Sequence, residues 1–412
     1  MHILIMGMNY HPEEIGIGPF TTELSNYLAR KGHKVTVVTA FPHYPEWKVY
    51  PGYRGNLFVK EMQQEVMVLR VYTYIPKTSS RIKRILYDVS LSCTSLISAL
   101  CVQRPDLIIC ICPPLLLGLS GLALSKVRGI PFLFHIQDLN IEAAIQVGML
   151  NNPILLRYLY KLEKRIYDEA AGISVIAHGI TKNLLSKGVP KSKIYELPNW
   201  ADSERLHPQS SDVAFRKQLG LSPKSVLVMY AGNLGNKQGL ETLIDAAALL
   251  KDRQEIRFAI CGDGTARKAL KERANHLGVA SIQFLGILHG SVMPSAFSAA
   301  DIFIITQKKE VVEFCLPSKL LSYSAVARPI IAAVNLRSET ASWINKANAG
   351  LVVPPENPEA LAEAILYLAS KRDLRTSLGE NAREHVVENF SRGNILPRFE
   401  EVIQTLNASR AP

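Results

Sequence analysis

Short runs rich in valine, isoleucine and leucine recur along the chain, and segments of helix length with an apolar face separate them. Apolar runs without strict polar alternation are typical of strands in a parallel sheet covered on both faces. The pattern therefore predicts repeated β–α units of the α/β class. The strands expected are residues 2–6, 35–39, 107–112, 132–136, 173–177 and 194–197, then 226–231, 257–261, 282–285, 302–305, 330–333 and 351–353.

A chain of 412 residues is too long for one ordinary hydrophobic core. A polar stretch after Pro208 precedes a fresh β–α series, which predicts two doubly wound Rossmann-like domains facing a central cleft. We expect the first domain over residues 1–200 and the second over residues 201–390. Residues 391–412 are expected to add a helix that can cross back onto the first domain.

Composition narrows the class of protein. With 48% hydrophobic and 20% charged residues, the chain is neither disordered nor collagen-like. Its six cysteines show no C-x-x-C spacing, so we expect free thiols in a reducing cytoplasm rather than a zinc or redox site. The first apolar run ends after six residues without a basic segment before it, which is not typical of a signal peptide.

The net charge of +11 is concentrated in the first half, where 22 basic and 14 acidic residues leave +8 over residues 1–200. Nucleic acid, anionic lipid and phosphorylated small molecules all fit a basic surface, but no zinc or helix-turn-helix spacing favours nucleic acid. The apolar segment 85–102 contains Asp88 and is a poor spanning helix. It is either a core helix with a basic cap or an interfacial helix whose basic end meets anionic lipid; that basic end comprises Lys77, Arg81, Lys83 and Arg84.

A glycine-rich turn follows the strand expected at residues 226–231. It contains Gly232, Asn233, Gly235 and Lys237. Glycine lets the backbone approach phosphate oxygens closely, and lysine adds a full charge beside the amide donors. The turn therefore predicts a diphosphate site, with an ordinary glycine-rich connection as the alternative. No G-K-[ST] occurs in the chain, which excludes a Walker A loop.

Two more segments are expected at the same sheet edge. The first is a strand-to-helix turn made of Gly262, Asp263 and Gly264. The second is a helix start made of Leu316, Pro317, Ser318 and Lys319. Proline is favourable in the first turn of a helix, whose exposed amides attract an anion. Asp263 can instead cap its helix, and Lys319 can instead be solvated.

The first half carries weaker signals. Gly16 and Gly18 form a turn that opens a helix, but Thr21 replaces the third glycine of a dinucleotide fingerprint. His135 lies near the end of the strand at residues 132–136 and Asp138 follows that strand, so both are near the edge where this fold binds ligands. Either His135 is a satisfied structural group or it acts at the site, and Asp138 can accept a hydrogen bond from an acceptor hydroxyl.

The chain resembles the family 4 glycosyltransferases of the two-domain GT-B fold over nearly its whole length. The order of the motifs carries this resemblance, and they include His135–Asp138 and residues 197–200 and 316–320. Transferases that build colanic acid and O-antigen units, including fucosyl and fucosamine transferases, are similar at residues 41–45. The resemblance implies retaining sugar transfer from a nucleotide-diphosphate donor such as a UDP or GDP sugar. It implies no cofactor and no required metal, a lipid-linked or oligosaccharide acceptor, and a location at the cytoplasmic face of the membrane.

By the same resemblance, the donor binds mainly to the second domain. Gly18 approaches the donor phosphate or the acceptor, and Lys237 and Lys319 hold the diphosphate in place of a divalent cation. His135 and Asp138 are the candidate catalytic groups of the first domain. Gln137 stands where many relatives have the histidine that precedes the aspartate.

The chain also departs from the family at a pair of glutamates eight residues apart. The corresponding positions are Phe314 and Ser322, so the usual carboxylate toward the donor ribose is missing. Glu310 and Glu313 lie close by and can substitute for the first glutamate. Two other readings remain open: a nucleotide-sugar epimerase or phosphorylase on the same fold, and a non-catalytic protein that keeps the fold.

Overall fold

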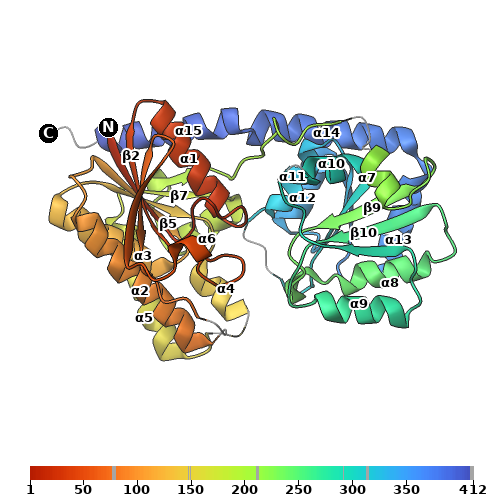
Figure 1. Ribbon diagram of the computed structural model, residues 1–412, viewed down its shortest axis with the longest axis horizontal. Helices are drawn as coiled ribbons and strands as arrows, with labels where there is room; N and C mark the ends of the chain where they lie inside the picture. The colour runs from red at the N-terminus through yellow and green to blue at the C-terminus, as the bar shows by residue number, and fades with distance from the viewer. Residues whose placement is uncertain are drawn as a thin grey trace. The chain divides into compact units, whose positions relative to one another are not determined.

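The computed structural model describes residues 1–76, 80–146, 148, 150–209, 213–290, 292–311 and 315–408. The chain forms two compact units (Figure 1). Unit 1 contains Met1–Asn199 and Ile395–Pro412, and unit 2 contains Trp200–Asn394. The division falls next to residue 200, and the C-terminal part of unit 1 begins at Ile395 rather than at residue 391.

Unit 1 is built on an eight-stranded sheet of order β3-β4-β2-β1-β5-β6-β7-β8. Neighbouring strands are parallel, apart from the antiparallel pair β3 and β4. The order reverses between β2-β1 and β5, where a doubly wound sheet binds its ligands. The strands are β1 (His2–Gly7), β2 (Lys34–Ala40), β3 (Phe58–Gln63), β4 (Val66–Val71), β5 (Leu107–Cys112), β6 (Phe132–Ile136), β7 (Gly172–Val175) and β8 (Ile194–Glu196).

The hairpin of β3 and β4 was not expected from the sequence. In β3 the exposed and half-buried residues alternate, as they do in an edge strand with one open face. Such a segment has no continuous apolar run, so the sequence pattern does not predict it. In β4, the fully buried Arg70 interrupts the apolar run near its end.

Among the described residues, seven α-helices belong wholly or mainly to unit 1. Figure 1 shows α2, α3 and α5 together on one side of the sheet and α1 on the other. The helices are α1 (Gly18–Arg30), α2 (Arg81–Leu100), α3 (Leu115–Arg128), α4 (Asn140–Gln146), α5 (Pro153–Glu169), α6 (His178–Ser186) and α15 (Arg392–Ala408), with short 3-10 turns η1 (Pro51–Tyr53) and η2 (Lys191–Lys193).

The C-terminal helix α15 packs on unit 1 from Ile395 onward. The Tyr27 hydroxyl donates to Glu400 Oε2 at 3.0 Å, which joins α1 to α15. The Phe399 ring meets the His135 ring edge to face, with 5.3 Å between their centroids. Far-separated parts of the chain therefore complete one core.

Unit 2 has a six-stranded parallel sheet of order β11-β10-β9-β12-β13-β14. The order reverses between β9 and β12, so the loops after these two strands start at the ligand-binding position of a doubly wound sheet. Each of the six strands overlaps a strand predicted from the sequence. They are β9 (Val226–Ala231), β10 (Ile256–Cys261), β11 (Ile282–Leu285), β12 (Ile302–Thr306), β13 (Ile330–Ala333) and β14 (Gly350–Val353).

Helices cover both faces of this second sheet. Successive residues of β9 point into two separate apolar clusters, with Leu227 and Met229 in one and Val228 and Tyr230 in the other. This alternation is why the strand is apolar throughout. The helices are α7 (Val213–Gln218), η3 (Asn236–Gln238), α8 (Glu241–Leu249), α9 (Arg267–His276), α10 (Val292–Ala299), α11 (Ser318–Ala325), α12 (Glu339–Ala347), α13 (Pro358–Ser370) and α14 (Arg372–Phe390).

Candidate functional site

The loops after β9 and β10 pack directly on each other at the carboxyl edge of the second sheet. The amide of Gly232 donates to Cys261 O at 2.9 Å, and the amide of Leu234 donates to Asp263 O at 2.9 Å. A Cβ atom at Gly262 would lie 1.9 Å from Gly232 O, closer than any real contact. Close backbone approach therefore requires glycine here, and it brings the predicted turns at residues 232–239 and 262–264 together.

Lys319, at the start of α11, reaches the same place. Its Nζ donates to the Tyr230 hydroxyl at 2.9 Å and lies 4.4 Å from the centre of that ring. The Tyr230 hydroxyl in turn donates to Asn233 O at 2.7 Å. A Cβ atom at Gly232 would be 3.8 Å from Lys319 Nζ, so the ammonium group stands directly beside the loop.

Burial raises the pKa of the Tyr230 phenol, so the phenol stays neutral and cannot form an ion pair with Lys319. The positive charge of Lys319 is therefore oriented by a hydrogen bond without being neutralised by this partner. A lysine ammonium group can form charge-assisted hydrogen bonds with an anion.

The helix that carries Lys319 is fixed to the end of β9. Tyr323 of α11 accepts from the Ala231 amide at 2.9 Å and donates to Ala231 O at 2.7 Å. Its ring stacks on Phe303 of β12, with centroids 3.9 Å apart and planes 8° from parallel. The first turn of α11, after Pro317, has no side-chain cap. Its amides therefore add partial positive charge beside Lys319.

Lys237 lies on η3, and its side chain is exposed. Its carbonyl oxygen accepts from the Lys308 amide at 3.0 Å, which joins the loop after β9 to the loop after β12. Gly239, with φ of +56°, closes this turn against the same segment. The structure thus places Lys237 on the rim of the loop, while Lys319 lies against its glycines.

The remaining predicted residues of this edge are arranged around these loops. Gly235 and Gly264 both pack near the Asn233 side chain. Asp263 is exposed and accepts from the Gly264 amide at 2.8 Å, so it stabilises its own turn and does not cap α9, which begins at Arg267. Leu316 and Pro317 are half-buried and Ser318 is exposed.

Of the two positions that correspond to the family's glutamates, the structure describes Ser322 but not Phe314. Ser322 is half-buried on α11 and donates to Ser318 O at 3.3 Å. Glu310 is exposed in the loop after β12. Phe314 and Glu313 lie outside the described residues. The substitution of Glu310 or Glu313 for the first glutamate remains a prediction.

In unit 1, the turn with Gly16 and Gly18 leads into α1. Gly16 has φ of +76°, which favours glycine. A Cβ atom at Gly18 would be 2.8 Å from Glu13 O, so the glycine is required by packing as well. These two glycines belong to unit 1, whereas the other predicted donor-binding residues belong to unit 2.

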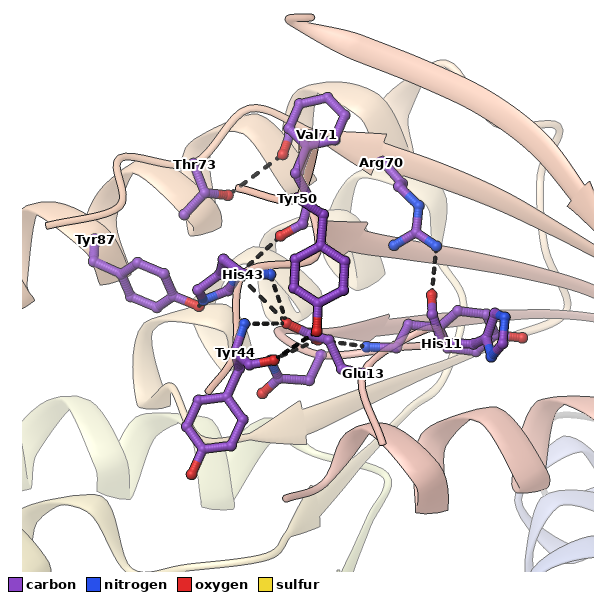
Figure 2. Close-up of polar contacts among 12 residues, drawn as sticks. His11, Glu13, His43, Tyr44, Tyr50, Arg70, Val71, Thr73 and Tyr87 are labelled. Carbon is purple, nitrogen blue, oxygen red and sulfur yellow. Dashed lines mark hydrogen bonds and ion pairs between the residues drawn. The ribbon is translucent and has the colours of Figure 1, made fainter. Parts of the chain in front are cut away.

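Sequence reasoning missed the buried carboxylate of Glu13, which organises the loops at this edge of unit 1 (Figure 2). Its Oε1 accepts from the amides of His43 at 2.8 Å and Tyr44 at 2.7 Å. Its Oε2 accepts from Asn9 Nδ2 at 2.8 Å and from the Tyr10 amide at 3.3 Å. One side chain thus ties the loop after β1 to the loop after β2.

His43 completes this cluster (Figure 2). Its Nδ1 lies 2.8 Å from Phe41 O, and its Nε2 lies 3.2 Å from the Tyr87 hydroxyl of α2. Burial lowers its pKa, so the neutral ring donates at Nδ1 and accepts at Nε2. The sequence motif at residues 41–45 pointed to the part of this cluster around His43. Glu13 lies about thirty positions earlier and belongs to no such motif.

His135 is enclosed in the core of unit 1, with 2% of its surface exposed. Its Nδ1 lies 2.9 Å from Ser174 Oγ, and its Nε2 lies 2.9 Å from Gln137 Nε2. Burial lowers its pKa to about 4. Because both ring nitrogens have partners inside the core, the geometry favours the structural alternative for His135, and a catalytic role remains a prediction.

Gln137 and Asn199 are bound to each other by two amide hydrogen bonds, of 3.0 and 2.8 Å. Gln137 therefore joins the end of β6 to the residue that closes unit 1. Asp138 is exposed at this edge, where its Oδ1 accepts from the Leu139 amide at 2.8 Å. Of the two predicted catalytic groups in unit 1, only Asp138 is accessible to a substrate.

In the described part of the chain, no cluster of three or more His, Cys, Asp or Glu side chains is arranged to bind a metal ion. Metal-independent catalysis remains a prediction. Over the same residues, none of the helices combines the length and apolarity needed to cross a bilayer.

Two sequence families match the chain. The family described as "Glycosyl transferase 4-like domain" matches residues 16–200. The family described as "Glycosyl transferases group 1" matches residues 212–385. Together the matches cover most of both units but not residues 1–15 or 386–412.

Two proteins that are similar to this chain in sequence are also described as glycosyltransferases. A putative colanic acid biosynthesis glycosyl transferase, WcaI of Escherichia coli K12, is 30% identical over 407 residues, 97% of this chain and 98% of its own. The probable glycosyltransferase WbjE of Pseudomonas aeruginosa is 26% identical over 74% of this chain and 76% of its own.

Among solved structures, sucrose-phosphate synthase from Thermosynechococcus elongatus superposes with a TM-score of 0.78 at 19% identity, covering 99% of each chain. Anabaena HepE in complex with UDP and glucose has a TM-score of 0.73 at 18% identity, covering 98% of this chain and all of its own. At these identities, the structures support the fold alone.

Proposed function

The chain belongs to the glycosyltransferases with a 4-like first domain and a group 1 second domain, in the GT-B fold, and from this premise we propose its donor, acceptor and stereochemistry. It transfers a sugar from a nucleoside-diphosphate donor to a lipid-linked saccharide, with retention at the anomeric carbon. The product belongs to exopolysaccharide, capsule or O-antigen synthesis, and fucose or fucosamine is the first sugar to test.

The observation that carries the donor assignment is the position of Lys319. Its ammonium group lies against Gly232, held by the neutral Tyr230 hydroxyl at 2.9 Å. Glycine-rich backbone and the first turn of α11 add amide donors at the same place. A diphosphate bound there would meet preorganised positive charge, with the exposed Lys237 as a second cation on the rim.

The reaction breaks the bond between the anomeric carbon and the diphosphate oxygen. It forms a bond from the same carbon to the acceptor oxygen on the same face of the sugar. The hydroxyl proton leaves with the departing diphosphate, and negative charge grows on that diphosphate as its bond breaks. Lys319 and nearby amides would stabilise this charge most strongly in the transition state, which is what accelerates the reaction.

The acceptor proposal is supported by relatives rather than by a bound molecule. The WcaI relative is named for colanic acid biosynthesis. The exposed Asp138 is the group of unit 1 that we propose as a hydrogen-bond acceptor for the sugar hydroxyl. A lipid-linked acceptor would place the enzyme at the cytoplasmic face of the membrane. For the donor, the HepE complex with UDP makes UDP sugars the first to test before GDP sugars.

A donor panel with membrane extract as the source of acceptor tests this function. We expect one nucleotide sugar to give a lipid-linked product whose anomeric configuration is that of the donor. Product with the opposite configuration would refute retention. Donor consumption without any acceptor would indicate an epimerase or a phosphorylase, and failure of any nucleotide to bind would indicate a non-catalytic protein.

Lys319→Ala tests the role of the central cation. We expect turnover to fall by at least about tenfold, because one 1.4 kcal/mol step of transition-state stabilisation is lost. The matched control is Lys268→Ala, which removes an exposed lysine from α9 of the same unit. Unchanged turnover in folded Lys319→Ala protein would contradict the assignment.

A further inference from the structure

Helix α2 has apolar residues on its outward face as well as its inward face. Tyr87, Leu91 and Ala99 are buried against unit 1. On the opposite side, large aliphatic residues are exposed to solvent, and the exposed Cys93 lies between Val89 and Ile97. The outward stripe consists of Ile82, Ile85, Leu86, Val89, Ile97 and Leu100, with exposed fractions of 73, 50, 49, 41, 64 and 39%.

An ordinary surface helix presents polar residues on its outward side. Exposed apolar residues scattered singly need no explanation, but a contiguous row along a helix of 20 residues does. The stripe therefore indicates a contact surface for another apolar phase or molecule.

The edge strand β3 adds to this surface. Phe58 and Met62 are exposed by 50 and 62%, and Lys60 between them is exposed too. Because side chains alternate along a strand, these three point to one face of the sheet and Glu61 to the other.

The face that carries Phe58 and Met62 is the face covered by α2. Glu61 binds Arg70, whose guanidinium donates to His11 O, and the His11 amide donates to Thr22 of α1. The Glu61 side is therefore the α1 side. The connection from β1 to β2 contains α1, and the connection from β4 to β5 contains α2. These two connections run in opposite directions across the sheet, so right-handed crossovers place α1 and α2 on opposite faces.

Positive charge borders this apolar surface. Lys60 lies on β3, and Lys83 and Arg84 lie in the first turn of α2. The Arg84 guanidinium is 4.5 Å from the centre of the Trp47 ring, which holds its charge near the start of the helix. The six stripe residues carry no charge themselves, so the arrangement is an apolar row with a basic border.

We propose that the α2 stripe and the β3 edge lie in the headgroup layer of an anionic bilayer, with Lys60 and Lys83 against lipid phosphates. An amphipathic surface bordered by lysine and arginine is the kind that binds in this layer. A second copy of this chain is the less favoured occupant, because it would bring two units of high positive charge together. The proposed function, with its lipid-linked acceptor, explains why the enzyme would bind a membrane. Binding of this surface to lipid itself needs neither donor nor acceptor.

Flotation of the full chain with vesicles measures this binding directly. We expect binding to phosphatidylglycerol/phosphatidylcholine vesicles and at least about tenfold weaker partitioning for the I85S/V89S/I97S variant, because apolar burial is lost. K60Q/K83Q should weaken binding to the anionic vesicles and leave the weak binding to pure phosphatidylcholine unchanged. The matched control is L249S/L336S in unit 2, whose residues are exposed by 56 and 62%.

Cys93 gives a readout that does not depend on the folding of the serine variants. It is exposed on α2, four residues before Ile97. An environment-sensitive fluorophore attached there, in a C101S/C315S background, should shift to the blue with anionic vesicles. UDP binding by the same proteins, measured by calorimetry, reports the proposed function separately.

Two results would overturn the proposal. One is equal vesicle binding by the wild type and I85S/V89S/I97S, together with an unshifted fluorophore at Cys93. The other is a change of oligomeric state in I85S/V89S/I97S, measured by sedimentation, with vesicle binding intact. The second result would assign the surface to contact between copies of the chain.

Discussion

Lys319 and His135 show how the surroundings of a residue decide its role. Both were candidates from the sequence, because His135 is near the end of an apolar strand and Lys319 is in a helix start, each expected at an edge where a parallel sheet binds ligands. Lys319 is held beside the backbone of Gly232 by a phenol that remains neutral. His135 has both ring nitrogens engaged inside the core. The sequence alone does not distinguish them, because the partners Tyr230 and Ser174 look like ordinary strand residues.

The burial of His135 predicts a pH dependence of stability. Its pKa of about 4 in the folded chain compares with 6.5 for the free side chain. The unfolded chain therefore takes up this proton first, and stability that is complete above pH 6.5 is lost as pH falls toward 4. The full loss is about 3 kcal/mol, and about 2 kcal/mol of it is reached at pH 5.

Hydrogen exchange of the β6 amides at pH 7 and pH 5, corrected for intrinsic exchange rates, measures this effect. His135→Asn should be less stable at both pH values but should lose the part of the pH dependence that His135 causes. His276→Gln, at an exposed site on α9, is the control and should keep it. The same pH dependence in His135→Asn as in the wild type would show that other groups cause the acid sensitivity.

At the scale of secondary-structure elements, the order of the parallel strands decides which loops lie side by side. Glycines then allow the backbones of those loops to pack closely. The strands of unit 2 were predictable, because a strand buried on both faces has a continuous apolar run. The β3–β4 hairpin was not, because an edge strand alternates. The Glu13 cluster could not be predicted either, since its carboxylate binds mostly backbone amides, which leave no mark in the residue types.

Gly262→Ala tests the contact between the loops after β9 and β10. The new Cβ atom would lie 1.9 Å from Gly232 O, and the backbone φ of +135° is unfavourable for alanine. We expect a loss of about 1–3 kcal/mol in the free energy of unfolding and weaker binding of nucleoside diphosphate. Gly286→Ala is the control, because its Cβ atom would meet no atom within 4 Å. Unchanged UDP affinity in Gly262→Ala would contradict the role of this loop pair.

At the scale of the whole molecule, unit 1 is completed by the end of the chain. The helix at the C-terminus was expected from its pattern, but its docking depends on contacts that no local pattern reports. Phe399, with 1% of its surface exposed, packs on His135. The two units therefore differ in how the chain builds them. Unit 2 is one continuous segment, whereas unit 1 consists of two segments.

Phe399→Ala should destabilise unit 1 selectively. Removing a buried phenylalanine costs about 3–5 kcal/mol. Hydrogen exchange should accelerate in β6 and β7, while the strands of unit 2 keep their protection. Glu401→Ala, at an exposed position of the same helix, should change neither unit. Equal acceleration in both units would show that α15 does not act through unit 1.

The central claim is that positive charge at the loop of residues 232–239 and at Lys319 binds the donor diphosphate. The most direct measurement is a crystal structure of the protein soaked with UDP or GDP in the presence of EDTA. The account predicts diphosphate oxygens within hydrogen-bond distance of Lys319 Nζ and of backbone amides in this loop. Crystals with no nucleotide at this loop, and with Lys319 and Lys237 directed into solvent, would contradict it.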